Sequence, residues 1–152
     1  MSNIVSLAGI TIQLANGYPK CEGGMQTWKY IVTFTNGPPK PGISDFAFQL
    51  CNPQHKVLSF SPSEGGEYDE NNAQPCLAGE FGATRQMKWN RSNDNVVGEY
   101  EFTLLGCFDS ADINIAVKAG PGCKYGKIIG PSCTITPPPP NVRGIKYSNL
   151  KN

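Results

Sequence analysis

The sequence predicts an all-β protein: an antiparallel β-sandwich with immunoglobulin-like or jelly-roll winding, braced by disulfides. The chain of 152 residues contains 17 Gly and 13 Pro, and both residue types mark turns and interrupt helices. Several short segments alternate apolar and polar residues, as half-buried strands do, and none repeats its apolar residues at helical spacing over three turns. Six cysteines in so short a chain are typical of a disulfide framework.

The expected strands follow one another along the chain as far as residue 129. Residues 10–14 form the first, and residues 28–35 give the strongest signal because their apolar side chains fall on one face. Further strands are expected at residues 43–50, 56–60, 85–89, 99–104, 112–118 and 124–129, whereas the polar, Gly-rich segment 61–84 is expected to be a loop. The inward positions of these strands predict a core of Trp28, Tyr30, Val32, Phe34, Phe46, Phe48, Phe102, Leu104, Ile113, Ile115 and Val117.

The chain is expected to divide into one domain and a tail. Residues 1–136 form the β-sandwich domain, in which residues 1–14 are an N-terminal strand or arm. Residues 137–140 are four prolines, a polyproline spacer, and residues 141–152 are a C-terminal arm. Both arms carry apolar side chains that can pair with a neighbouring copy: Ile4, Val5 and Leu7 in the first, and Val142, Ile145, Tyr147 and Leu150 in the second.

The six cysteines are expected to form three disulfides. A hairpin between strands 99–105 and 112–118 would bring Cys107 near Cys123, and the ends of two core strands would bring Cys51 near Cys133. Cys21 and Cys76 then remain. No two cysteines form a C-x-x-C pair and the chain has a single histidine, so a zinc site is not expected. Because disulfides persist in oxidising surroundings, the mature protein is expected outside the cytosol.

No catalytic, cofactor-binding or metal-binding residue is expected, and the protein is not expected to be an enzyme. His55 lies in the polar turn 51–56 and is interpreted as a solvated loop histidine rather than a catalytic base. With the cysteines oxidised, no thiolate is left to act as a nucleophile. One loop is interpreted as a solvated acidic surface, with calcium binding left open as an alternative. The spacing of its side chains matches no EF-hand. Its oxygen-bearing side chains are Glu64, Glu67, Asp69, Glu70, Asn71 and Asn72.

Charge and hydropathy exclude two classes of partner. The formal net charge is +1 with no long run of one sign, so the chain has no electrostatic footprint for nucleic acid. No apolar stretch approaches the ~20 residues of a membrane-spanning helix, so insertion into a membrane is not expected.

The first residues, Met1 to Ile10, contain neither a basic region nor a long apolar region, so they do not form a secretory signal. Two explanations stay open. The chain is a mature form that carries a new start Met, or it is made inside a cell that later lyses, as happens for the outer layers of bacterial spores. Either explanation places the working protein outside a cell or on a cell or spore surface.

Four aromatic residues on the expected strands are open to two interpretations: Trp28, Tyr30, Trp89 and Tyr100. Rings exposed side by side would form a platform on which sugars stack, whereas buried rings would be core residues. Core packing is the preferred interpretation, because alternating aromatics on strands usually face inward.

Four stretches carry a resemblance to known proteins: Trp-Lys-Tyr-Ile-Val at 28–32, Ile-Ser-Asp-Phe-Ala-Phe-Gln-Leu-Cys at 43–51, Lys-Ala-Gly at 118–120 and Ile-Gly-Pro-Ser-Cys at 129–133. On these stretches, residues 28–133 resemble a loosely defined group of bacterial surface and secreted β-sandwich domains. Those domains often carry Ile-Ser-His where this chain has Ile43-Ser44-Asp45. The resemblance implies the fold and an extracellular setting, and it brings no shared activity. In kind, the chain is also similar to the subunits of bacterial endospore appendages, although it lacks their N-terminal Cys-Cys pair.

The expected function is structural. The protein is expected to be a self-assembling surface or fibre subunit whose terminal arms add strands to the open sheet edge of another copy of itself. The alternative is an extracellular carbohydrate- or cell-surface-binding module that acts as a monomer through its loops.

Overall fold

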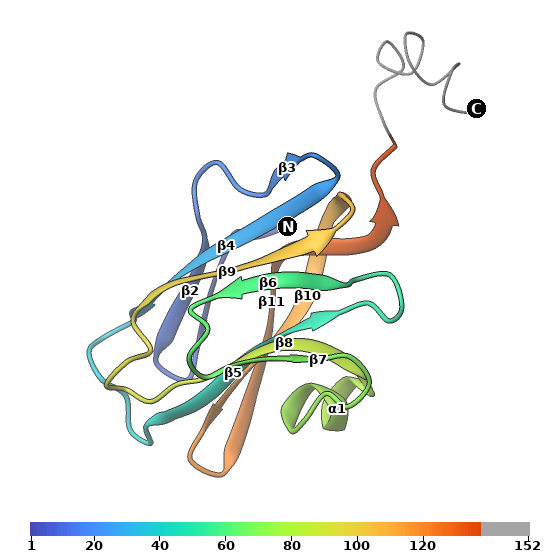
Figure 1. Cartoon of the computed structure of the whole chain (residues 1–152). Helices are drawn as coiled ribbons and strands as arrows, with labels where there is room; N and C mark the ends of the chain where they lie inside the picture. The colour runs from blue at the N-terminus through green and yellow to red at the C-terminus, as the bar shows by residue number, and fades with distance from the viewer. Residues whose placement is uncertain (138–152) are drawn as a thin grey trace, which may run out of the picture.

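The computed structural model describes residues 1–137, which form two antiparallel sheets packed face to face (Figure 1). The first sheet runs in the order β1 (Ile4–Leu7), β2 (Ile10–Leu14), β4 (Met25–Phe34), β9 (Gly98–Leu105) and β6 (Val57–Ser61), with the short β3 (Lys20–Glu22) also paired to β4. The second sheet runs in the order β11 (Gly122–Ile135), β10 (Phe108–Ala119), β5 (Ile43–Leu50), β8 (Arg85–Asn90) and β7 (Gly66–Asp69). The predicted disulfide-braced β-sandwich is therefore confirmed.

The order of the strands matches immunoglobulin-like winding rather than a jelly roll. Strands β2-β4-β9-β6 have the order and connections of the A-B-E-D sheet of an immunoglobulin constant domain, and β11-β10-β5 have those of its G-F-C sheet. The hairpin of β7 and β8 is an addition, which enters the chain between the fourth and fifth of these strands and extends the second sheet beyond β5.

Aromatic side chains from both sheets make the centre of the core. The ring of Tyr30 on β4 lies 4.5 Å from that of Phe48 on β5, and the ring of Phe46 lies 5.8 Å from that of Trp89 on β8. Every residue of the predicted core is buried except Phe34, which is partly buried and packs against the others. The prediction succeeds because alternation along a strand decides which side chains face inward.

The sequence predicted that segment 61–84 is a loop, and this prediction is wrong for part of the segment. It contains strand β7, which pairs with β8, and helix α1 (Cys76–Phe81). The six residues of α1 are too few to show a helical repeat. Cys76 and Leu77 of α1 pack instead against Ala47 and Ala116 on the outer face of the second sheet. No helix within residues 1–137 is long and apolar enough to cross a membrane.

The N-terminal arm belongs to the domain's own sheet, so the expectation of an arm free to pair with a neighbour is wrong for Ile4, Val5 and Leu7. Strand β1 pairs with β2 along its whole length, and the Ile129 N–H donates a hydrogen bond of 2.9 Å to the Ser2 carbonyl. Val5 and Leu7 pack over Gly126 so closely that a Cβ there would lie 2.9 Å from Val5 Cγ2. These contacts close the side of the sandwich between β2 and β11. The C-terminal arm, with Val142, Ile145, Tyr147 and Leu150, and residues 138–140 of the spacer lie outside the described residues.

Candidate functional site

All six cysteines form disulfides, and one of the expected pairs is present. Cys51 at the end of β5 is joined to Cys133 of β11, as predicted. Cys21 of β3 is joined to Cys107, which precedes β10, and Cys76 of α1 is joined to Cys123 of β11. Three disulfides indicate an oxidising environment such as the outside of a cell.

The expected pair of Cys107 with Cys123 is wrong, because each of these cysteines is bonded to one of the two that were left over, Cys21 and Cys76. Strands β10 and β11 do form a hairpin, but Lys118 lies opposite Cys123, whereas Phe108 lies opposite Ile135. Cys107 and Cys123 therefore sit at opposite ends of strand β10, about 36 Å apart for the eleven residues from Cys107 to Lys118 at ~3.3 Å per residue. The sequence did not show how long this hairpin is.

His55 is completely buried, so its interpretation as a solvated loop histidine is wrong. Its Nδ1 accepts a hydrogen bond of 2.8 Å from the Cys51 N–H, and its Nε2 lies 2.7 Å from the Ser132 carbonyl oxygen, which can only accept. The ring is therefore neutral with its proton on Nε2. Burial lowers the pKa of His55, which agrees with this state. The histidine links the turn after β5 to β11, next to the Cys51–Cys133 disulfide.

Arg85 forms hydrogen bonds to the same turn. Its guanidinium is buried and donates from Nη1 to the carbonyls of His55 and Pro53, at 2.6 and 3.2 Å. Its Nε donates to the Glu70 carbonyl at 3.0 Å. Backbone oxygens thus replace the water that a buried charge loses. Nothing in the sequence distinguished this arginine from an exposed one.

The four aromatic residues considered as a sugar platform are core residues. Trp28, Tyr30 and Trp89 are 0% exposed and Tyr100 is 2% exposed. Burial also raises the pKa of the Tyr30 hydroxyl far above its usual range. A carbohydrate-binding role would have to use a different part of the surface.

The acidic loop considered for calcium uses its side chains within the protein. Glu67 accepts a hydrogen bond of 2.9 Å from Asn90 Nδ2, which lowers the pKa of the Glu67 carboxyl, and Lys88 Nζ lies 3.5 Å from the same carboxylate. Asp69 accepts from Gln86 Nε2 at 2.8 Å. Within residues 1–137, no three His, Cys, Asp or Glu side chains converge as a metal site would require.

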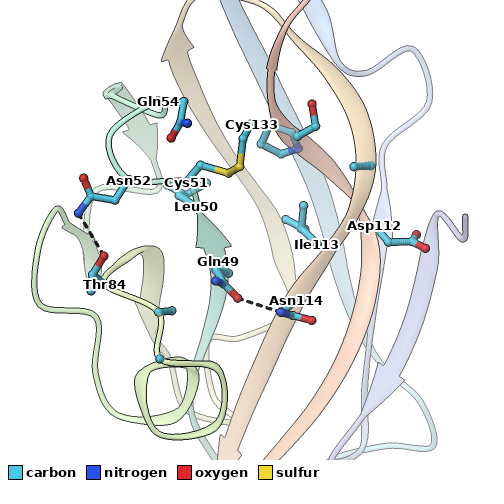
Figure 2. Close-up of a pocket in the computed structure, with 15 residues that line it drawn as sticks. Gln49, Leu50, Cys51, Asn52, Gln54, Thr84, Asp112, Ile113, Asn114 and Cys133 are labelled. Carbon is cyan, nitrogen blue, oxygen red and sulfur yellow. Dashed lines mark hydrogen bonds between the residues drawn. A yellow bond between two sulfur atoms is a disulfide. The ribbon is translucent and has the colours of Figure 1, made fainter.

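A polar pocket of about 510 Å³ lies on the outer face of the second sheet, beside the Cys51–Cys133 disulfide (Figure 2). Its floor includes Gln49 of β5 and Asn114 of β10, whose side chains point toward one another in Figure 2. One wall is the segment 82–84, which follows α1, and another is the segment 131–133 of β11. Its polar side chains are Gln49, Asn52, Gln54, Thr84, Asp112, Asn114 and Ser132.

Hydrogen bonds fix the orientation of the amides in this pocket. The Lys127 ammonium can only donate, and it donates to Asn114 Oδ1 at 2.8 Å. Asn114 Nδ2 must then face Gln49, whose Oε1 accepts at 2.9 Å. Gln49 Nε2 is left without a partner within the described residues. The sequence did not reveal these residues as a site, because alternation shows only that Gln49 and Asn114 face outward and not that they meet.

A second amide is fixed at the edge of the pocket. Asn52 Nδ2 donates to Thr84 Oγ1 at 3.1 Å and to Asn71 Oδ1 at 3.0 Å, so its nitrogen is engaged and its oxygen is left to accept (Figure 2). Asp112 contributes the only carboxylate among the lining residues. The arrangement is suited to holding a ligand by hydrogen bonds.

Comparison with known proteins gives no relative from which a function can be carried over: no family model matches the chain, and neither a curated protein nor a solved structure matches it significantly.

Proposed function

We propose that the protein is a structural, non-enzymatic subunit of a self-assembling layer or fibre on a cell or spore surface, such as an appendage or pilus-like filament. Copies are joined through the C-terminal segment 141–152. The observation that carries the proposal is the way in which the chain leaves the domain.

The exit point is held by two hydrogen bonds immediately before the prolines. The Thr136 N–H donates to the Cys107 carbonyl and its hydroxyl donates to Asp109 Oδ1, each at 2.8 Å. Four prolines in extended conformation would advance about 12 Å, at ~3.1 Å per residue. A segment that follows a fixed exit point and four prolines is better placed to reach a neighbouring molecule than its own domain.

The end of the molecule from which the chain exits also carries exposed apolar side chains. We call them the exit patch: Met25, Leu58, Leu105 and Ile135, which are 44%, 44%, 54% and 62% exposed. Met25 and Leu105 are direct partners on β4 and β9, and Ile135 is the last residue of β11. Exposed apolar surface of this kind is typical of a contact between proteins.

The turn between β10 and β11 lies at the opposite end of the molecule from the exit point (Figure 1). Beside this turn is a mainly apolar cleft of about 360 Å³. It is lined by Ala8, Gly9, Pro39, Pro41, Ala119 and Gly122, together with Lys40 and Lys124. Contact between the exit end of one copy and this cleft on the next would be heterologous, and heterologous contacts that repeat without closing produce a filament. We propose this cleft as the acceptor of the segment 141–152.

Sedimentation and electron microscopy test the role of the segment. The parent protein is expected to form concentration-dependent filaments. Replacing Val142, Ile145, Tyr147 and Leu150 together by Ser should leave a monomer, because the apolar contacts are lost. The matched control replaces Arg143, Lys146 and Lys151 by Ser and should still assemble. A parent that stays monomeric at high concentration, or a fourfold Ser variant that assembles as well as the parent, would refute the proposal.

Gly122→Trp tests the acceptor separately. A Cβ on Gly122 meets nothing within 4 Å, so the backbone accepts a side chain there, and the indole should obstruct the cleft and assembly. Gly79 on α1 is equally open, so Gly79→Trp is the control and should assemble normally. If Gly122→Trp assembles like the parent, the segment docks elsewhere.

A further inference from the structure

We infer that the polar pocket beside the Cys51–Cys133 disulfide is a binding site for a neutral, hydroxyl-rich ligand, a mono- or disaccharide unit. This inference is independent of assembly, since none of the pocket residues belongs to the exit patch or to the apolar cleft.

The pocket offers donors and acceptors whose directions are set from outside it. Lys127 sets the orientation of the Asn114 amide, and Asn114 donates to the Gln49 oxygen. Gln49 Nε2 has no partner within residues 1–137 and can donate to a ligand. The Asn52 nitrogen is engaged, so its oxygen is a free acceptor, and Thr84, which accepts from Asn52, keeps its hydroxyl proton to donate. Sugar hydroxyls donate and accept at the same atom, so they can satisfy both kinds of group.

The charge of the site matches a neutral ligand. None of the lining residues is Lys or Arg, which an anion such as phosphate would need, and Lys127 reaches the pocket only through its hydrogen bond to Asn114. Asp112 alone supplies a carboxylate, whereas a hard cation takes six to eight oxygen ligands. Amide groups with one carboxylate are therefore better suited to hydroxyls than to ions.

The size and stiffness of the pocket support the same ligand. A volume of about 510 Å³ lies within the range of small-molecule sites, about 300–1,000 Å³. The Cys51–Cys133 disulfide and the buried His55 fix the wall formed by residues 131–133, so little order has to be gained on binding.

Nuclear magnetic resonance of the full chain tests the inference, because side-chain amide groups give their own signals. The probes are lactose, maltose, cellobiose and N,N′-diacetylchitobiose, each raised to about 50 mM, a range that reveals even millimolar affinity. At least one of them is expected to shift the side-chain signals of Gln49, Asn52 and Asn114. Gln49→Ala should weaken that binding about fivefold or more, as expected for the loss of one hydrogen bond. Gln13→Ala, on the outer face of the first sheet, is the matched control and should bind like the parent.

Three results would overturn the inference. The first is no shift with any of the four sugars, and the second is a set of shifts that maps outside the pocket or is unchanged by Gln49→Ala. The third is tighter binding of glucuronate or inorganic phosphate to the same amides, which would make the ligand an anion.

Discussion

Two buried polar residues near the Cys51–Cys133 disulfide form their hydrogen bonds with backbone groups. His55 bridges the Cys51 N–H and the Ser132 carbonyl, and Arg85 donates to three carbonyls around the same turn. Neither has a carboxylate partner among the salt bridges of the described residues, so the positive charge of Arg85 lies beside an imidazole that cannot gain a proton without cost. The stability of this part of the molecule should therefore depend on pH.

We predict that the protein loses stability as the pH falls from 7.5 to 5.5. The folded-state pKa of His55 is lowered by burial, so below the unfolded-state value of about 6.5 the unfolded chain binds a proton that the folded protein does not. Stability is then complete above about pH 6.5 and falls by up to about 1.4 kcal/mol per pH unit below it. Urea denaturation at several pH values measures this change.

The control for this prediction is His55→Gln, which removes the only histidine of the chain. Its free energy of unfolding should be lower than that of the parent near neutral pH but nearly constant across the same pH window. A parent whose stability does not change between pH 7.5 and 5.5 would show that His55 titrates normally in the folded state.

At the scale of elements, helix α1 is held to the second sheet by one disulfide and a small apolar cluster. Ala47 and Ala116 are small enough for Leu77 to reach the outer face of the sheet, and Cys76 is bonded to Cys123. The segment 82–84, which follows the helix, forms a wall of the polar pocket. The position of α1 therefore determines the shape of the pocket.

We predict that replacing Cys76 and Cys123 together by Ser costs about 2–5 kcal/mol of unfolding free energy, because the bridge closes a loop of 47 residues. The change should also be local: hydrogen exchange should increase in residues 70–84 while β4, β9 and β10 stay protected. Replacing Cys21 and Cys107 by Ser is the control, and it should leave exchange in residues 70–84 unchanged. Equal exchange in both variants would mean that the helix does not depend on its disulfide.

At the scale of the whole molecule, the N-terminal strand and the end of β11 are held to the domain in different ways. The N-terminal strand β1 completes the first sheet and its side chains fill the gap toward β11. The C-terminal end of β11 is fastened by Thr136, beyond which only Pro137 belongs to the described residues. In the proposed assembly, the C-terminal segment alone links copies, so each subunit links in one direction.

We predict that deleting residues 1–9 lowers the melting temperature by about 5 °C, whereas deleting residues 138–152 leaves it unchanged. The first deletion removes the packing of Val5 and Leu7, worth about 2 kcal/mol for two partly buried side chains. Thermal unfolding followed by circular dichroism at low protein concentration separates these effects from assembly. Equal melting temperatures for the parent and the first deletion would mean that β1 does not stabilise the domain.

The sequence by itself determined the fold class and the core. Side chains on one face of a strand recur every two residues, so Trp28, Tyr30 and Val32 could be assigned to the interior from their spacing alone. The same local rule gave most of the strands, and the even number of cysteines gave the disulfide framework. These features depend on residues that are close together in the chain or on composition.

Only the tertiary structure decided which distant residues meet. Cys107 pairs with Cys21 rather than Cys123 because the length and register of the β10–β11 hairpin separate the latter two. His55 is buried because Ser132, 77 residues away, lies against it, and Gln49 and Asn114 form a pocket because β5 pairs with β10. Strand register, and with it every contact across strands, depends on how the whole chain packs, which no local pattern of residues records.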